Sequence, residues 1–179
     1  MQLRMIKPIP TTVADFFYIK EGVIYNKTNR GPRAKKDQPS GTVNVCGYII
    51  ININRTLYLA HRIAWFLYYG EQPPNTIDHI DGDRTNNKKE NLRECTQQEN
   101  MYNQKIPKNN TSGVKGVTWN RDRNKWRAYI YINGKRKHIG YYTCIKEAEQ
   151  VVRKEREQYH REFSNHGTSQ ETSVEALTL

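Results

Sequence analysis

The chain has 179 residues, a hydrophobic fraction of 36% and a formal net charge of +11. This length allows one ordinary domain or two small ones, and the low apolar fraction predicts small cores. The charge makes a polyanion the expected partner, although a basic solvated surface without a partner is the alternative. The sequence has no long apolar run of bilayer-spanning length, so we expect a cytoplasmic protein without membrane insertion.

The basic excess lies mainly after residue 100. Residues 1–100 carry 14 Lys and Arg against 10 Asp and Glu, whereas residues 101–163 carry 15 against 6. The later region is therefore predicted to supply most of the phosphate affinity. Cys46, Cys95 and Cys144 are far apart and form no C-x-x-C pair. This spacing argues against a zinc knuckle or a disulfide framework and predicts reduced core thiols.

The first hundred residues alternate short apolar runs with polar turns. We expect a short helix over residues 12–18 and a strand over 22–25, followed by a basic loop over 26–40. That loop could touch a DNA backbone or could simply be solvated. Strands are predicted over residues 43–46, 48–54 and 57–59, and a buried helix over 61–69 that ends at Gly70.

From residue 77 the pattern is a strand, a long polar loop, a strand over 92–95 and then a helix. Thr96 and Glu99 fit a capping box, which places Asn100 in the first turn of that helix. Residues 104–112 have the composition of a linker.

The last part of the chain predicts three strands over residues 114–119, 125–132 and 135–141, and a helix over 145–163. The Asn133-Gly134 dipeptide favours a type I′ hairpin between the second and third strands. Three strands and a helix make a minimal sheet-on-helix module. The predicted organisation is a first domain over 1–103, a linker over 104–112, a second domain over 113–163 and a disordered tail over 164–179.

A carboxylate and an imidazole stand side by side at Asp78 and His79. Carboxylate and amide oxygens, such as those of Asp78 and Asn100, suit Mg²⁺, and an imidazole can activate a water molecule for attack on a phosphodiester. Asn91 can order the loop by bonding backbone groups. The alternative is a polar turn between two core strands, in which Asp81 is a turn former.

These residues resemble the HNH endonucleases, in the H-N-N subgroup of phage and intron-borne homing nucleases. The residues that match the family pattern are Asp78, His79, Asp81, Gly82, Asn86, Asn87, Asn91, Leu92, Arg93, Thr96, Glu99 and Asn100. The resemblance spans about residues 40–103 and implies an α+β protein that begins with a ββα-metal (His-Me finger) domain. It implies that His79 is the general base, that Asp78 and Asn100 bind one divalent ion, and that Asn91 orders the loop. Asparagine at the third family position favours Mg²⁺ or Mn²⁺ over zinc.

Basic and aromatic residues alternate along the later strands. On the middle strand, Lys125, Arg127 and Tyr129 share one face, and Trp126 is expected in the core on the other. This region resembles an ethylene-response-factor (APETALA-two, AP2) DNA-binding domain, a three-stranded antiparallel sheet packed on one helix. The predicted DNA contacts are Lys115, Trp119, Arg121, Arg123, Lys125, Arg127, Lys135 and Lys137, with Arg62 in the first domain as a further candidate. For Arg62 and Trp119 a structural role is an equal alternative.

The sequence therefore predicts a metal-dependent endonuclease that nicks double-stranded DNA as a monomer, anchored by its second domain. The resemblance implies a homing-type enzyme of a phage or mobile element that acts in the host cytoplasm. A non-catalytic, sequence-specific DNA-binding regulator is the main alternative, and an RNA-binding or RNA-cleaving protein is a third.

Overall fold

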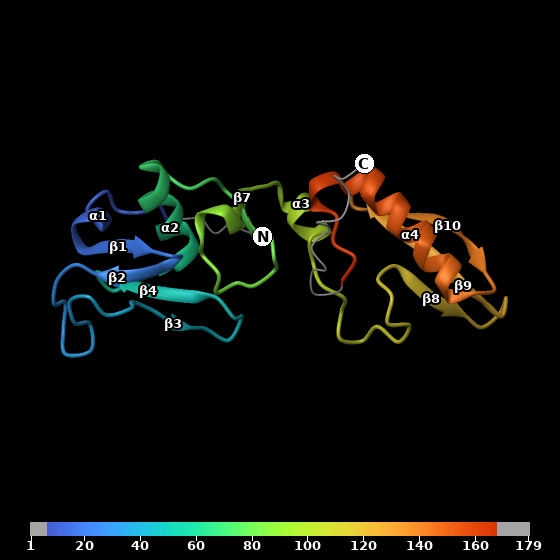
Figure 1. Ribbon diagram of the computed structural model, residues 1–179, viewed down its shortest axis with the longest axis horizontal. Coiled ribbons are helices and arrows are strands. Elements are labelled where there is room, and N and C mark those ends of the chain that lie inside the picture. The colour runs from blue at the N-terminus through green and yellow to red at the C-terminus, as the bar shows by residue number, and fades with distance from the viewer. Residues whose placement is uncertain (1–6, 168–179) are drawn as a thin grey trace, which may run out of the picture. The chain divides into compact units, whose positions relative to one another are not determined.

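A computed structural model describes residues 7–167 of the chain. The chain divides into two compact units, Met1–Thr96 and Gln97–Leu179, and each is described by itself (Figure 1). Among the described residues, every helix is too short or too polar to cross a membrane.

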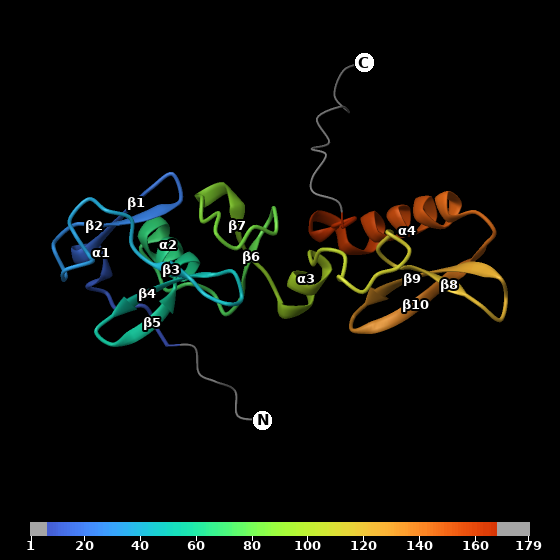
Figure 2. The same ribbon diagram turned by 90° about the horizontal axis from the view of Figure 1, so that it is seen from below.

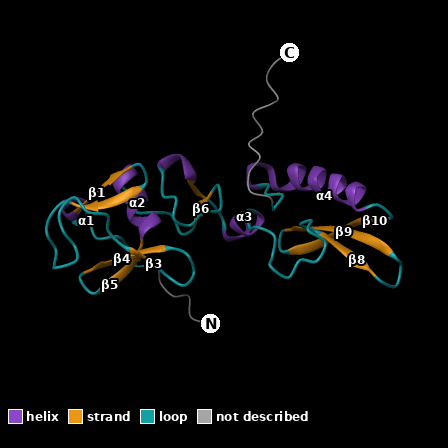
Figure 3. Ribbon diagram, turned by 60° about the horizontal axis from the view of Figure 1, so that its bottom comes forward, coloured by secondary structure: helices purple, strands orange, loops and turns teal. Residues whose placement is uncertain are grey.

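The first unit is built from short strands around one central helix. Its elements are α1 (Val13–Phe16), β1 (Phe17–Lys20), β2 (Val23–Asn26), β3 (Thr42–Val43), β4 (Ile49–Ile53), β5 (Thr56–Leu59), α2 (Ala60–Tyr69), β6 (Ile77–His79), η1 (Lys89–Asn91) and β7 (Leu92–Glu94). The strands form three small antiparallel sheets, β1–β2, β3–β4–β5 and β6–β7. Long loops join them, as Figure 3 shows.

Helix α2 forms the centre of the first core. Ile63 and Ala64 are fully buried and belong to one apolar cluster with Phe17 and Ile51. Gly70 ends the helix in the left-handed conformation, at φ 73°, and its N–H bonds the carbonyl of Phe66 at 2.9 Å. A glycine adopts this conformation without steric cost, so the predicted helix and its end at Gly70 are confirmed.

The basic loop after β2 is folded although it has almost no regular structure. The N–H groups of Asn26, Asp37 and Ser40 donate to backbone carbonyls of the loop and of β2, at 2.7–3.1 Å. Gly41 closes the loop at φ 107°, where a Cβ atom would lie 2.7 Å from the side chain of Ile49. Close packing therefore requires glycine at this position.

The described residues of the second unit, 97–167, form one sheet, one long helix and short helical turns. Its elements are α3 (Gln97–Tyr102), β8 (Val117–Asn120), β9 (Lys125–Ile132), β10 (Lys135–Tyr142), α4 (Ile145–His160) and η2 (Arg161–Phe163). The antiparallel strand order is β10–β9–β8, and α4 lies along one face of the sheet (Figure 2). Val117, Ala128, Ile130, Ala148 and Val152 form the core between them.

The hairpin between β9 and β10 sets the register of this sheet. Asn133 and Gly134 have φ angles of 51° and 72°, the positive values that a type I′ turn needs. The two-residue turn places Ile132 opposite Lys135 and Tyr131 opposite Arg136. Residues directly opposite each other share a face, so the turn decides which side of the sheet each β10 side chain occupies.

The predictions for the C-terminal tail and for the cysteines are wrong in part. Residues 164–167, placed in the disordered tail by the sequence, are held by hydrogen bonds, because Asn165 Nδ2 donates to the carbonyl and Oδ1 of Asn103 at 2.8 and 2.9 Å. The rest of the predicted tail, residues 168–179, lies outside the described residues. No disulfide joins the three cysteines, all of which fall within residues 7–167, but Cys46 and Cys144 are exposed and not core thiols.

Candidate functional site

The Asp78–Asn91 motif forms the β6–β7 hairpin of the first unit. Ile77, Asp78 and His79 lie opposite Glu94, Arg93 and Leu92 in the antiparallel pair. The connecting loop is organised by Asn91, whose Nδ2 donates to Asp81 Oδ1 at 2.9 Å and to the Asn86 carbonyl at 2.8 Å. Its Oδ1 accepts the N–H of Asp81 at 3.0 Å. Asn91 is 7% exposed, so these bonds hold the loop from within.

The imidazole of His79 is held by a buried amide. Its Nε2 lies 3.1 Å from Oδ1 of Asn87, and the two side chains are 4% and 2% exposed. Asn87 Nδ2 points toward the carbonyl of Thr85 at 3.4 Å, which assigns the amide oxygen to the histidine. This arrangement suits the tautomer in which Nε2–H donates to Asn87 Oδ1 and Nδ1 bears the lone pair. The sequence reading placed Asn87 in the motif but gave it no role.

Two further rings border His79. His61, from α2, meets His79 edge to face at 5.2 Å between ring centroids, and Tyr48 lies 5.5 Å from His61 and 6.1 Å from His79. Burial, with His79 and Arg62 nearby, lowers the pKa of His61 to about 3, so its ring is neutral at ordinary pH. The guanidinium of Arg84 lies 4.8 Å over the Tyr48 ring and donates to the Cys46 carbonyl at 2.7 Å.

The carboxylate of Asp78 forms a cross-strand ion pair. Arg93 donates to Asp78 Oδ2 through Nε at 2.9 Å and through Nη2 at 2.7 Å, and the side chains are 15% and 5% exposed. The pair fixes the orientation of the Asp78 carboxylate on the strand residue that precedes His79. A carboxylate in this position is a hard oxygen donor. Asn100, the other predicted metal ligand, lies in α3 and is partly buried.

The open face of the second sheet carries arginines over tyrosines. Arg127 and Arg136 place their guanidinium groups 5.8 and 5.5 Å from the ring of Tyr129, and Arg123 lies 4.7 Å over Tyr141. The opposite face is covered by α4. This Arg–Tyr face combines positive charge with flat aromatic surface, which suits phosphates and bases.

The structure changes which residues of β10 can belong to that face. Lys137 points toward α4, where its Nζ bonds Glu155 Oε2 at 2.7 Å and the Tyr159 hydroxyl at 3.1 Å. Lys135 lies opposite Ile132 and shares that side of the sheet. Lys135 and Lys137, two of the predicted DNA contacts, therefore lie on the α4 side of the sheet, whereas Arg136 lies on the open face. The two-residue Asn133-Gly134 turn sets this register.

Lys115 has a structural position and not the predicted DNA-contacting one. Its Nζ donates to the carbonyls of Tyr102, Gln104 and Asn165. Burial, with Arg156 nearby, lowers its pKa to about 7. Arg156 is 3% exposed and donates to the Lys115 carbonyl at 2.7 Å. These bonds tie the residues after α3 to the end of α4.

Trp119 and Arg62 also contact the protein itself. Trp119 lies opposite Trp126, on the α4 side of the sheet edge, with the ring centroids 4.9 Å apart. Trp119 is 42% exposed, whereas Trp126 packs against the core as predicted. Arg62 donates to the carbonyls of Pro73 and Pro74 at 3.3 and 2.8 Å, and burial lowers its pKa. The structural alternative accounts for the position of Arg62.

The remaining predicted DNA contacts are solvent-accessible. Arg121, Arg123 and Lys125 are exposed in or beside the β8–β9 turn. Arg127 is partly buried on the open face of β9. With Arg136 they form a continuous candidate set around the Arg–Tyr face.

Comparison with known proteins gives one family match and one related phage protein. Residues 58–102 match the HNH endonuclease family model. The chain is 38% identical over 105 residues to Protein 3.8 of Escherichia phage T7, an alignment that spans 58% of this chain and 86% of that protein. No solved structure matches the chain.

Proposed function

Because the chain belongs to the same family as Protein 3.8 of Escherichia phage T7 and contains an HNH endonuclease domain at residues 58–102, we propose that it is a metal-dependent DNA endonuclease. The observation that carries the proposal is the buried His79 imidazole, held by Asn87, on the β6 residue that follows Asp78, whose carboxylate is held by Arg93. A base and a hard oxygen ligand on one short strand are the groups that phosphodiester hydrolysis requires.

His79 acts as the general base in this proposal. With Nε2–H directed at Asn87, Nδ1 takes the proton of the attacking water, and Asn87 stabilises the imidazolium that forms. The hydroxide oxygen bonds to phosphorus, and the ester oxygen leaves with its electron pair and is then protonated. His61 and Tyr48 limit the movement of the ring, because they pack against it from α2 and from the residue before β4.

The chemistry of the Asp78 carboxylate suits a hard divalent ion. Asp78 offers a carboxylate, and Asn100 is the second oxygen ligand that the sequence pattern predicts, a donor set that suits Mg²⁺ or Mn²⁺ better than zinc. A bound ion would neutralise charge on the phosphate and the leaving oxygen. Arg93 would share the carboxylate with it and hold Asp78 in place. We further propose that one such site per chain nicks one strand.

The second unit is proposed to anchor the enzyme on duplex DNA. The Arg–Tyr face, with Arg123, Arg127 and Arg136, and the exposed Arg121 and Lys125 support this role. The AP2-type likeness is one of sequence pattern, and we include Arg136 because it shares the open face with Arg127, whereas Lys135 and Lys137 lie on the α4 side.

Relaxation of supercoiled plasmid tests the activity. The wild type should nick the plasmid with Mg²⁺ and not with EDTA, whereas His79→Ala and Asp78→Asn should lose activity at least a hundredfold. Asp15→Asn, an exposed residue of α1, is the matched control for the loss of one negative charge.

Thermal melts of all four proteins separate catalytic loss from unfolding. A wild type that binds duplex DNA and nicks none, or a folded His79→Ala protein that nicks as fast as the wild type, would contradict the catalytic proposal. The first of these results would support the DNA-binding regulator instead.

A further inference from the structure

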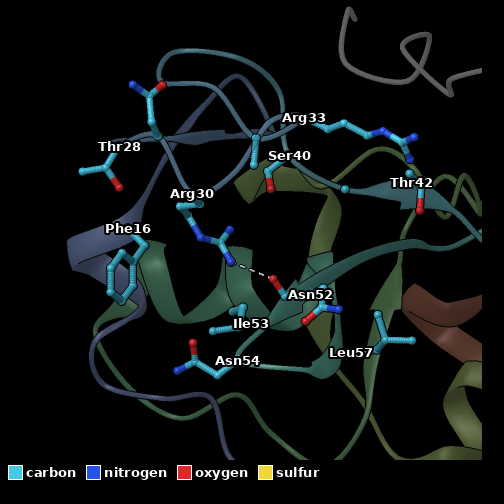
Figure 4. A pocket seen from close by; sticks show the side chains of 13 residues that line it. Phe16, Thr28, Arg30, Arg33, Ser40, Thr42, Asn52, Ile53, Asn54 and Leu57 are labelled. Atoms are coloured by element: carbon cyan, nitrogen blue, oxygen red, sulfur yellow. Dashed lines mark hydrogen bonds between the residues drawn. The ribbon is translucent and has the colours of Figure 1, made fainter.

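The folded basic loop of the first unit encloses a pocket separate from the β6–β7 hairpin. The pocket has a volume of about 720 Å³ and lies between the loop after β2 and strands β4 and β5 (Figure 4). This is the size of a small-molecule site. Among the described residues, its lining includes Arg30 and Arg33 and no Asp or Glu.

Arg30 reaches into this pocket in a fixed pose. Its Nη2 donates to the Asn52 carbonyl at 2.7 Å (Figure 4). The guanidinium also lies 4.4 Å over the ring of Phe17. Burial lowers the pKa of Arg30. A guanidinium has five N–H groups in one plane, so a group held in this way keeps further donors for an anion.

The rest of the lining offers hydrogen bonds of the same kind. Thr28, Ser40 and Thr42 contribute hydroxyls, and Asn54 contributes an amide. Neutral donors beside two guanidinium groups, without a carboxylate, are the surroundings that a phosphate selects.

The loop that carries these groups is ordered by its own bonds. Arg30 N–H donates to the Ala34 carbonyl at 2.8 Å, and Asn29 Oδ1 accepts the N–H of Lys36 at 2.9 Å. Long loops without secondary structure that are nevertheless folded are commonly functional. A loop needed only to join β2 to β3 could be far shorter.

We propose that this pocket binds a phosphate group of a nucleotide, either one in the backbone of DNA or one of a free nucleotide. The site does not involve His79 or a metal ion, so it persists if the protein has no nuclease activity. With DNA as the ligand, the pocket would bind a backbone phosphate at some distance from the bond that is cleaved. As a free-nucleotide site it would make the protein responsive to the nucleotide pool.

Binding measurements in EDTA test the pocket with the full chain. The first arm uses a labelled 30-base-pair duplex over a range of NaCl concentrations, and the second uses dAMP and ATP in NMR titrations. Arg33→Gln is the main variant, because Arg33 is exposed at the rim, and Lys35→Gln is its control in the same loop, with the same charge change. Thr42→Val removes one lining hydroxyl without changing the charge.

A backbone-phosphate site predicts that Arg33→Gln weakens duplex binding about tenfold and reduces the salt slope by about 0.9, while Lys35→Gln has little effect. A free-nucleotide site predicts the same ranking for dAMP or ATP, with amide shifts at the pocket. Thr42→Val should weaken whichever ligand binds about threefold. If Arg33→Gln and Lys35→Gln are equivalent in both arms, or Thr42→Val changes neither, the proposal is overturned.

Discussion

Replacement of Asn87 tests the assignment of the basic nitrogen of His79. In Asn87→Leu the side chain keeps a similar volume but no longer accepts a hydrogen bond, so Nε2–H is left without its amide partner. The imidazole can then adopt the other tautomer, which puts the proton on Nδ1 and removes the base. We expect slower cleavage with little change in DNA affinity.

The magnitude follows from burial. His79 and Asn87 are 4% and 2% exposed, so water cannot replace the lost bond. An unsatisfied buried donor costs about 1–3 kcal/mol, and each ~1.4 kcal/mol in the barrier is a tenfold change in rate. The rate of the chemical step should fall about tenfold to a hundredfold.

Single-turnover nicking of supercoiled plasmid between pH 6 and 9 measures this step. Asn87→Asp restores an acceptor and should recover part of the rate, with the rising limb of the profile moved to higher pH, because a carboxylate stabilises the imidazolium. Asn75→Leu, the same exchange at an exposed loop position, is the control. Wild-type rates in a folded Asn87→Leu protein would refute the tautomer argument.

Three further outcomes are expected. Arg136→Gln should reduce the salt slope of duplex binding, measured by fluorescence anisotropy, by about 0.9. Lys137→Gln should leave the slope unchanged, because Lys137 is the next residue of β10 but is bonded to Glu155. Equal slopes for the two variants would show that DNA does not bind the Arg–Tyr face. Arg93→Met should lower the free energy of unfolding in urea by about 3 kcal/mol, because it leaves the buried Asp78 carboxylate without this partner, and a loss below about 1 kcal/mol would contradict that reading. The pKa of His61 is lowered from 6.5 to about 3, so below pH 6.5 the unfolded chain binds a proton at this residue and the folded chain does not. The free energy of unfolding should therefore fall by about 2 kcal/mol through this group between pH 6.5 and pH 5. Urea titrations at both pH values should show that His61→Phe lacks this pH-dependent loss.

Local patterns predicted the regular elements well. The apolar spacing of α2 and the glycine after it define that helix, and Asn133-Gly134 defines the β9–β10 hairpin. These features depend on neighbours within a few residues, which a single sequence contains.

Contacts between distant segments were not predictable in the same way. His61 precedes His79 by 18 positions, and only the packing of α2 on the hairpin brings the rings together. Helix α4 shows the same limit. Its buried side continues from Val152 to Arg156 and His160, whose partners are the carbonyls of Lys115 and Tyr131. A polar residue can occupy a core position only if it has such a hydrogen-bond partner, and the partner lies far away in the sequence. The apolar spacing of α4 therefore predicts its buried side as far as Val152 but not at the polar positions that follow.

The positions of the basic side chains show why the net charge of the chain overstates the number of residues available to contact DNA. Arg62 bonds proline carbonyls, Lys115 bonds three backbone carbonyls and Lys137 bonds Glu155, so each uses its charge inside its own unit. A cation satisfied in this way has little to gain from a phosphate, because binding DNA would first break those bonds. The arginines of the Arg–Tyr face instead lie over aromatic rings, which fix the position of each guanidinium without neutralising its charge. Affinity for DNA should therefore follow the face that a side chain occupies more closely than the number of basic residues in the chain.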